Sequence, residues 1–167
     1  MGEVRGGLDQ VLSSVSMLQV RGGADAVQGL MPKARVLVRG DVGYIFTSEF
    51  RRLPPTMRFF TGGDRSVRGF RYEGIGARDS LGNIIGGKAL VVGSVEFDYQ
   101  ILPSWAIAVF TDAGSADEKL SFRNLEHSVG PGIRYLSPIG PIRLDVAFAL
   151  SRPRSPMRLH ISLGPDI

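Results

Sequence analysis

Hydrophobic and polar residues alternate with a period of two along most of this chain. The clearest stretches are 90–99, 105–112, 142–151 and 157–164. In the last of these, every second residue from Met157 to Leu163 is apolar, and the residues between them are polar or charged. A period of two is typical of β-strands that have one apolar face. The pattern therefore predicts an all-β protein.

Turn-forming residues between these stretches divide the chain into strands and connections. Seven strands are predicted, at about 8–20, 33–47, 87–100, 104–113, 126–136, 140–151 and 157–165. The later connections are short and rich in Pro, Ser and Gly, which favours an antiparallel meander. The exception is the segment 48–86, and a loop of that length inside a compact domain is commonly functional.

The length of the strands favours a membrane barrel over a soluble sandwich. They run to about 9–12 residues, close to the ~9–11 that a tilted strand needs to cross a bilayer, whereas soluble strands average ~5–6. A barrel in lipid turns its apolar face outward and keeps glycine, alanine and charged residues inside. The mean hydropathy of +0.06 agrees with such alternation. A soluble β-sandwich that binds a partner remains the alternative.

Composition removes several classes of function. The chain has no cysteine, which excludes disulfides and thiolate sites. Its net charge of +4 is spread along the sequence without a basic run, so we expect no nucleic-acid partner. His127 and His160 lie on different predicted strands, without the spacing of a metal site or a catalytic triad. We therefore expect no catalytic residue, metal or cofactor, and no enzymatic activity.

The beginning of the chain, 1–7, lacks the charged start and apolar run of a secretory signal peptide. Since a membrane barrel must be exported, we expect this chain to be the carboxy-terminal part of a longer protein.

One segment of the long loop is distinctive. Residues 59–70 read Phe-Phe-Thr-Gly-Gly-Asp-Arg-Ser-Val-Arg-Gly-Phe, which resembles the conserved loop motif of the BamA/TamA superfamily of outer-membrane insertases, also called the bacterial surface antigen family. Within that superfamily it is most similar to the TamA branch. Four further segments resemble the family's later strands in the same order: 86–97, 109–114, 130–147 and 160–167.

The resemblance implies the fold and the placement of the loop. It implies a sixteen-stranded transmembrane β-barrel of which this chain, 1–167, forms about the last seven strands, without the signal peptide and the POTRA domains. The loop, about 48–86, would fold back into the lumen, where Arg68, Gly69 and Phe70 form a latch against the inner wall. The alternation independently places three partners for Arg68 on the inner face, namely Glu96, Phe110 and Asp112. The carboxylates would bind the guanidinium group, and the ring would stack on it.

The resemblance also implies a weakly paired closing strand. In the family this strand forms a lateral seam with the first barrel strand, here at Leu159, Ile161, Leu163 and Gly164. An unpaired strand edge can template a strand of another protein. Pro165 would weaken pairing further because it lacks a donor, and Ile167 stands where outer-membrane proteins usually have an aromatic residue.

The implied function is assembly of other outer-membrane proteins, or autotransporter secretion, by strand templating at this seam. The implied location is the bacterial outer membrane. The implied partners are membrane lipid, client β-barrel proteins and a periplasm-spanning protein like TamB. A two-partner secretion translocator, a pore of the same superfamily for one exported client, is the alternative.

Overall fold

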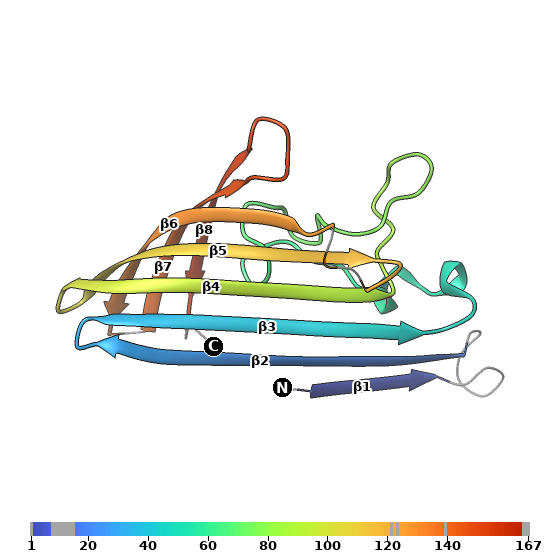
Figure 1. Cartoon of the computed structure of the whole chain (residues 1–167), viewed down its shortest axis with the longest axis horizontal. Helices are drawn as coiled ribbons and strands as arrows, with labels where there is room; N and C mark the ends of the chain where they lie inside the picture. The colour runs from blue at the N-terminus through green and yellow to red at the C-terminus, as the bar shows by residue number, and fades with distance from the viewer. Residues whose placement is uncertain (1, 8–15, 121, 123, 139, 165–167) are drawn as a thin grey trace.

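The computed structural model forms one antiparallel sheet whose strands follow one another in chain order (Figure 1). It describes residues 2–7, 16–120, 122, 124–138 and 140–164, with the backbone alone for 2–7. The strands are β1 (Gly2–Gly7), β2 (Met17–Met31), β3 (Ala34–Phe46), β4 (Ala89–Leu102), β5 (Trp105–Asp117), β6 (Glu126–Ser137), β7 (Gly140–Ala149) and β8 (Met157–Leu163). The sheet curls, so that β7 and β8 lie behind β4 and β5 (Figure 1). The predicted all-β antiparallel meander is confirmed.

The amino-terminal part differs from the prediction. A strand was predicted at 8–20, but 8–15 lies outside the described residues, and β2 begins at Met17 and continues to Met31. The glycines of β2 interrupt the alternation of apolar and polar residues, so the sequence pattern does not show the full strand. The strand is held instead by pairing with β3, from Leu18 opposite Phe46 to Met31 opposite Ala34. With β1, the described sheet has eight strands rather than seven.

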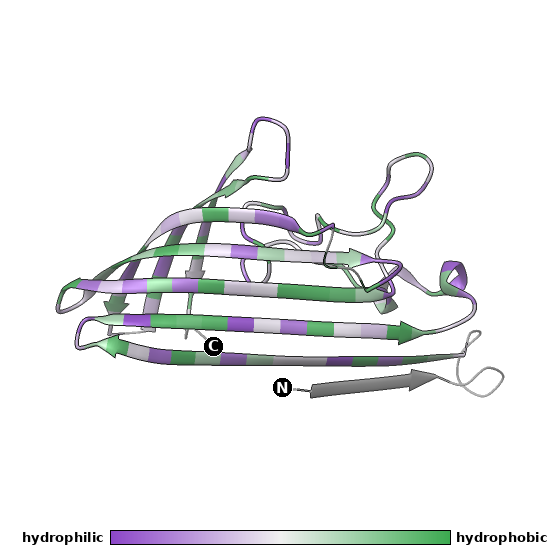
Figure 2. Cartoon of the chain, viewed as in Figure 1, coloured by the Kyte–Doolittle hydropathy of each residue, from purple (hydrophilic) through white to green (hydrophobic). Residues whose placement is uncertain are grey.

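The outer face of the sheet is apolar, as the alternation predicts. On β8, Met157, Leu159, Ile161 and Leu163 are all between 60% and 70% exposed, and Figure 2 shows apolar and polar residues interspersed along β2 to β5. Aromatic pairs lie toward the two ends of the outer face. They are Trp105 with Tyr135 (ring centroids 4.6 Å apart) and Tyr44 with Phe46 (4.8 Å). An apolar band between aromatic girdles is typical of a barrel in lipid. Among the described residues, no helix has the length and hydropathy to cross a bilayer.

The connections differ in length at the two ends of the sheet. The turns β2–β3, β4–β5 and β6–β7 take two residues each and lie at the left in Figure 1, whereas the connections 47–88, 118–125 and 150–156 lie at the other end. Barrels of the outer membrane have short turns on the periplasmic side and long loops on the outside. This difference gives the sheet a direction across the membrane.

Lysine at position 95 tests which medium surrounds the outer face. Val95 lies on β4 between the aromatic pairs and is 45% exposed. A Val95→Lys substitution is expected to lower the free energy of unfolding by about 2–4 kcal/mol in phospholipid vesicles, because the charge would face hydrocarbon. Leu81→Lys in the long loop is the control, since Leu81 is 84% exposed. Equal urea midpoints for the two variants would contradict a lipid-facing outer surface.

Candidate functional site

The long loop is built from short hydrogen-bonded turns rather than regular elements. Two 3-10 turns, Phe50–Arg52 and Pro55–Met57, lead into it. Further on, Thr61 pairs with Ile75, and the Gly63 N–H donates to the carbonyl of Val67 at 3.1 Å. These bonds fold the segment between Thr61 and Ile75 back on itself. Arg68, Gly69 and Phe70 consequently lie at the tip that reaches the inner wall.

A dry cluster joins this loop to the inner wall. From the loop it takes Phe50, Leu53, Phe59, Val67, Phe70 and Ile75, and from the wall Ile45, Leu90, Val92, Ala116 and Ala149. The sequence predicted small and charged residues on the inner face, but Leu90 and Val92 point inward there. They do so because the loop covers them, so that part of the inner wall is a protein core rather than a wetted surface.

Arg68 is saturated with hydrogen bonds. Its Nε and Nη2 donate to the two oxygens of Asp112 at 2.8 and 2.9 Å, and its Nη1 donates to Glu96 at 2.6 Å and Asp145 at 3.1 Å. Nη2 also donates to the Ser94 hydroxyl at 3.4 Å, so each guanidinium N–H has a partner. The Arg68 backbone N–H donates to Asp112 at 3.0 Å. This geometry fixes both the side chain and the loop backbone.

The surroundings hold Arg68 in its charged form. The residue is only 2% exposed. Burial lowers the pKa of Arg68, but the hydrogen bonds and charge of Asp112, and then those of Glu96, outweigh burial and raise the pKa above its ordinary value. Arg68 is therefore a permanent cation when the loop is docked.

The partners of Arg68 belong to a larger set of ion pairs, buried apart from the partly exposed Arg35, which we call the inner-wall ion network. It contains four carboxylates and four guanidinium groups: Glu96, Asp98, Asp112, Asp145, Arg35, Arg68, Arg134 and Arg143. Glu96 receives three of these arginines, at 2.6 to 2.7 Å. Equal numbers of both signs compensate these charges, which all lie away from water except that of Arg35.

The Phe110 ring packs against the guanidinium group of Arg68. The guanidinium carbon lies 3.4 Å from the centroid of the Phe110 ring, which is stacking distance. The ring in turn occupies the space over Gly130, where a Cβ atom would lie 2.8 Å from Phe110 Cζ and 1.9 Å from the Val146 carbonyl oxygen. Glycine at 130 on β6 thus makes room for the ring that supports Arg68.

Gly69 brings the loop against the last strands. It has a φ of +89°, which glycine adopts without cost, and a Cβ atom there would lie 3.3 Å from the backbone nitrogen of Ala149. Its N–H donates to His160 Nε2 on β8 at 2.9 Å. The other ring nitrogen, Nδ1, contacts the Asp64 carboxylate.

Phe70 is covered by the loop between β7 and β8. The guanidinium carbon of Arg152 lies 5.6 Å from the centroid of the Phe70 ring, and Arg152 pairs with Glu126. Phe70 itself is part of the dry cluster. The three residues of the latch therefore contact three different parts of the wall.

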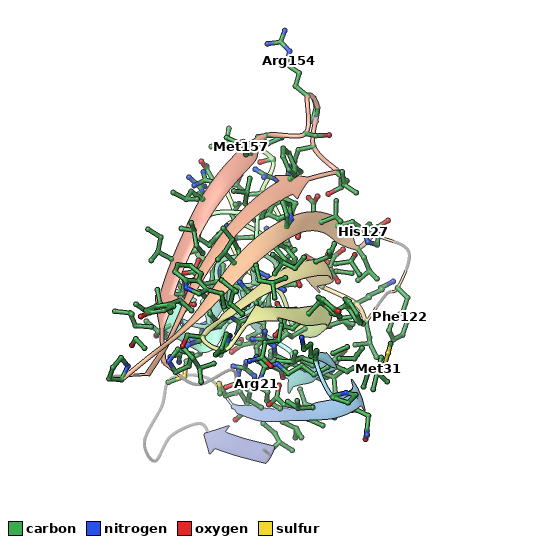
Figure 3. All side chains as sticks on the ribbon, turned by 90° about the vertical axis from the view of Figure 1, so that its left-hand side faces the viewer. Arg21, Met31, Phe122, His127, Arg154 and Met157 are labelled. Carbon is green, nitrogen blue, oxygen red and sulfur yellow. The ribbon has the colours of Figure 1, made fainter. Side chains whose placement is uncertain are left out.

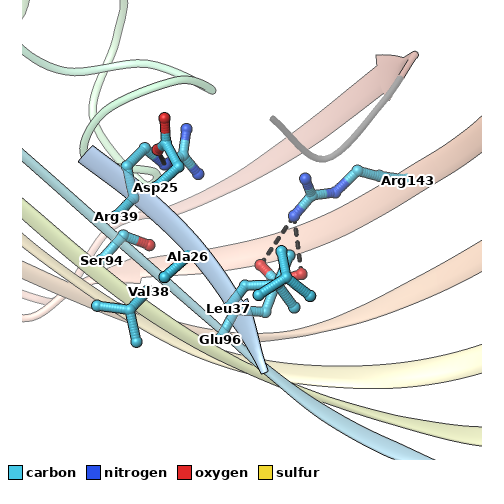
Figure 4. A pocket seen from close by; sticks show the side chains of 9 residues that line it. Asp25, Ala26, Leu37, Val38, Arg39, Ser94, Glu96 and Arg143 are labelled. Atoms are coloured by element: carbon cyan, nitrogen blue, oxygen red, sulfur yellow. Dashed lines mark hydrogen bonds and ion pairs between the residues drawn. The ribbon is translucent and has the colours of Figure 1, made fainter. Parts of the chain in front are cut away.

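A cavity of about 20 Å³ lies beside the ion network. Figure 4 shows Arg39, Ser94, Glu96 and Arg143 around it, with the Arg143–Glu96 ion pair drawn. Its volume suits a single water molecule, far below the ~300–1,000 Å³ of ligand pockets. It is a polar gap in the network and not a binding site for a small molecule.

The structure brings together all six residues that the sequence assigned to the latch. They are Arg68, Gly69, Phe70, Glu96, Phe110 and Asp112. The sequence did not identify Ser94 and Asp145 as partners of Arg68, Arg134 and Arg143 as partners of Glu96, or His160 as the acceptor for Gly69. A signal existed for the first four, since each lies on the polar side of its strand, but nothing in the sequence aligned those strands with one another.

The residues assigned to the seam lie at the carboxy-terminal edge of the sheet. Leu159, Ile161 and Leu163 point outward from β8, and Gly164 follows the strand with a φ of +120°. Within the described residues, β8 pairs with β7 alone. Pro165 and Ile167, to which the sequence assigned weak pairing and an unusual ending, lie outside the described residues.

Comparison with known proteins gives three findings. The profile of the Omp85 superfamily domain matches residues 3–166. The outer membrane protein assembly factor BamA of Nitratidesulfovibrio vulgaris (strain Hildenborough) is 32% identical over 109 residues, which are 61% of this chain and 14% of that protein. The crystal structure of BamA from Haemophilus ducreyi lacking POTRA domains 1-3 has the same fold, with a TM-score of 0.72 at 20% identity over 97% of this chain and 36% of that one. This chain thus spans a minor part of both relatives.

Proposed function

Because this chain belongs to the Omp85 superfamily, we propose that it forms part of a barrel that assembles other proteins into the outer membrane. Members of this family are non-enzymatic barrels of the outer membrane, and this chain is located in that membrane. The observation that carries the proposal is the saturated Arg68, held by carboxylates of three strands inside a sheet whose outer face is apolar. Such a loop braces the barrel wall from within, while the backbone edge of β8 has no further strand paired to it in the part of the chain that the structure describes.

The chain is proposed to be the carboxy-terminal part of that barrel. Its sheet ends in two edges, β1 and β8, which are not paired with each other in the part of the chain that the structure describes. Strands that precede β1 in the whole protein would lie between these edges and complete the even-numbered barrel. The POTRA domains and the signal peptide are expected upstream of those strands.

Insertion of a client protein would require an edge strand to pair with, and no chemical reaction. An edge strand with free N–H and C=O groups can pair with the strand of a client, and each added strand then offers its own edge to the next. On β8 that edge adjoins the outward residues Leu159, Ile161 and Leu163, so a client strand would enter directly beside lipid. The partners in this proposal are membrane lipid and client β-barrel proteins.

Three roles within the superfamily are candidates for this chain. Both relatives above are BamA proteins, which supports a general assembly factor. A TamA-type role in autotransporter secretion, with a TamB-like partner that spans the periplasm, rests on the motif at 59–70 alone. A two-partner secretion pore would use the same docked loop to block a channel for a single client.

Depletion of the whole protein distinguishes these roles. If it is a general assembly factor, depletion lowers the outer-membrane amounts of many unrelated β-barrel proteins, measured by quantitative proteomics of isolated outer membranes. Loss of autotransporters alone would favour the TamA-type role. Loss of one secreted protein, with the barrel proteins unchanged, would contradict assembly and identify a translocator.

A further inference from the structure

A histidine on the closing strand connects that strand to the tip of the loop. The Gly69 N–H donates to His160 Nε2 at 2.9 Å, so Nε2 is the unprotonated ring nitrogen. The ring proton then lies on Nδ1, which donates to the Asp64 carboxylate. This assignment follows from the hydrogen-bond network around the ring. One imidazole therefore bridges two points of the loop, on either side of Arg68.

The position of His160 in the sheet makes this bridge specific to β8. His160 is 9% exposed and points inward, whereas its neighbours Leu159 and Ile161 point outward. Among the described residues of β8, His160 is the one whose side chain hydrogen-bonds to the loop. In the ladder it lies opposite Asp145 of β7, which binds Arg68 at 3.1 Å.

We propose that His160 is a positioning residue that couples the docked loop to the closing strand, so that β8 stays in place only while Gly69 occupies its site. Without the imidazole, the ion network would still hold the loop on β4, β5 and β7 through Glu96, Asp112 and Asp145. The ion network includes no residue of β8, so this strand would then depend on its pairing with β7 alone. The meaning of this coupling for client entry rests on the proposed function.

Two substitutions separate hydrogen bonding from ring packing. His160→Phe keeps a planar ring of similar size but leaves the buried Gly69 N–H without an acceptor. His160→Gln loses the ring but places an amide oxygen where Nε2 lies. His127→Phe on β6 is the matched control, because the His127 side chain is exposed (Figure 3).

Hydrogen exchange in the intact protein in nanodiscs measures the coupling. His160→Phe is expected to speed exchange of the Gly69 amide and of the β8 amides about tenfold, since a buried donor loses its partner and the strand opens more often. His160→Gln and His127→Phe should exchange as the unaltered protein does. Unchanged exchange of β4 amides verifies that the rest of the sheet is folded.

Either of two results would overturn the coupling. One is exchange in His160→Phe equal to that of the unaltered protein, and the other is exchange in His160→Gln as fast as in His160→Phe. The outer-membrane level of client proteins is a separate readout. Normal client levels in a variant with a loosened β8 would count against templating at the seam, while the coupling itself would stand.

Discussion

Arg68→Ala is expected to lower the free energy that holds the loop in its docked position by about 3–5 kcal/mol, the cost of breaking a buried ion pair from one side. This cost arises from the carboxylates that the substitution leaves without Arg68. Asp112, Glu96 and Asp145 would keep their charges, yet lose the guanidinium group that all three contact. Water would have to enter the site to solvate them, and the loop would have to move to admit it.

Cleavage by chymotrypsin after Phe70 measures this effect. Phe70 is buried, so the protease reaches it only when the loop leaves the wall. Arg68→Ala should be cut after Phe70 within minutes under conditions that leave the Phe70–Arg71 bond of the unaltered protein intact, with the cleaved bond identified by mass spectrometry because Tyr72 is exposed in both proteins. Arg154→Ala is the control, because Arg154 extends into solvent from the β7–β8 loop (Figure 3). Equal cleavage of both variants would show that the ion network does not hold the loop.

Arg68→Lys refines the same prediction. Lysine keeps the positive charge but has three donors in place of five, and it cannot bind Asp112 through two parallel hydrogen bonds. It also loses the flat surface that stacks on Phe110. We therefore expect cleavage at a rate between those of the unaltered protein and Arg68→Ala. Protection as complete as that of arginine would mean that charge alone holds the loop.

The second large effect is expected for Gly130→Ala, which should cost about 3 kcal/mol of the free energy of unfolding. The added methyl group would lie 1.9 Å from the Val146 carbonyl oxygen, which belongs to the backbone of the neighbouring strand and cannot turn aside. It would also meet Phe110 at 2.8 Å and push the ring into Arg68. A single small substitution would therefore disturb both the sheet and the latch.

Gly93→Ala is the matched control for this substitution. Gly93 also lies within a strand, but a Cβ atom there has nothing within 4 Å. Alanine at 93 should be neutral or stabilising by about 0.5–1 kcal/mol, because it restricts the unfolded chain. Urea unfolding in lipid vesicles compares the two. Similar midpoints for Gly130→Ala and Gly93→Ala would contradict the close fit at β6.

The sequence predicted the latch because alternation and motif agreed there. Period two placed Glu96, Phe110 and Asp112 on one face, and the motif supplied Arg68 as the group that needs them. Local pattern assigns residues to a face, but it does not align separate strands. Asp145 becomes a partner of Arg68 only through the registers of the intervening strands, and these are tertiary facts.

His160 was missed for a different reason. The spacing of histidines in a sequence can indicate a metal or catalytic site, whereas this histidine acts as a hydrogen-bond acceptor for a backbone N–H far away in the chain. The inward Leu90 and Val92 did leave a signal, since 89–92 is an unbroken apolar run. Such a run indicates a strand that is covered on both faces, and here the docked loop is the second cover.

The composition of the inner-wall ion network has an electrostatic consequence for loop release. Without Arg68 the wall retains three guanidinium groups and four carboxylates, an excess of one negative charge. An undocked loop would leave behind an anionic, poorly solvated recess. The negative potential of this recess would attract the displaced Arg68 side chain from several ångströms away, before any close contact had formed again.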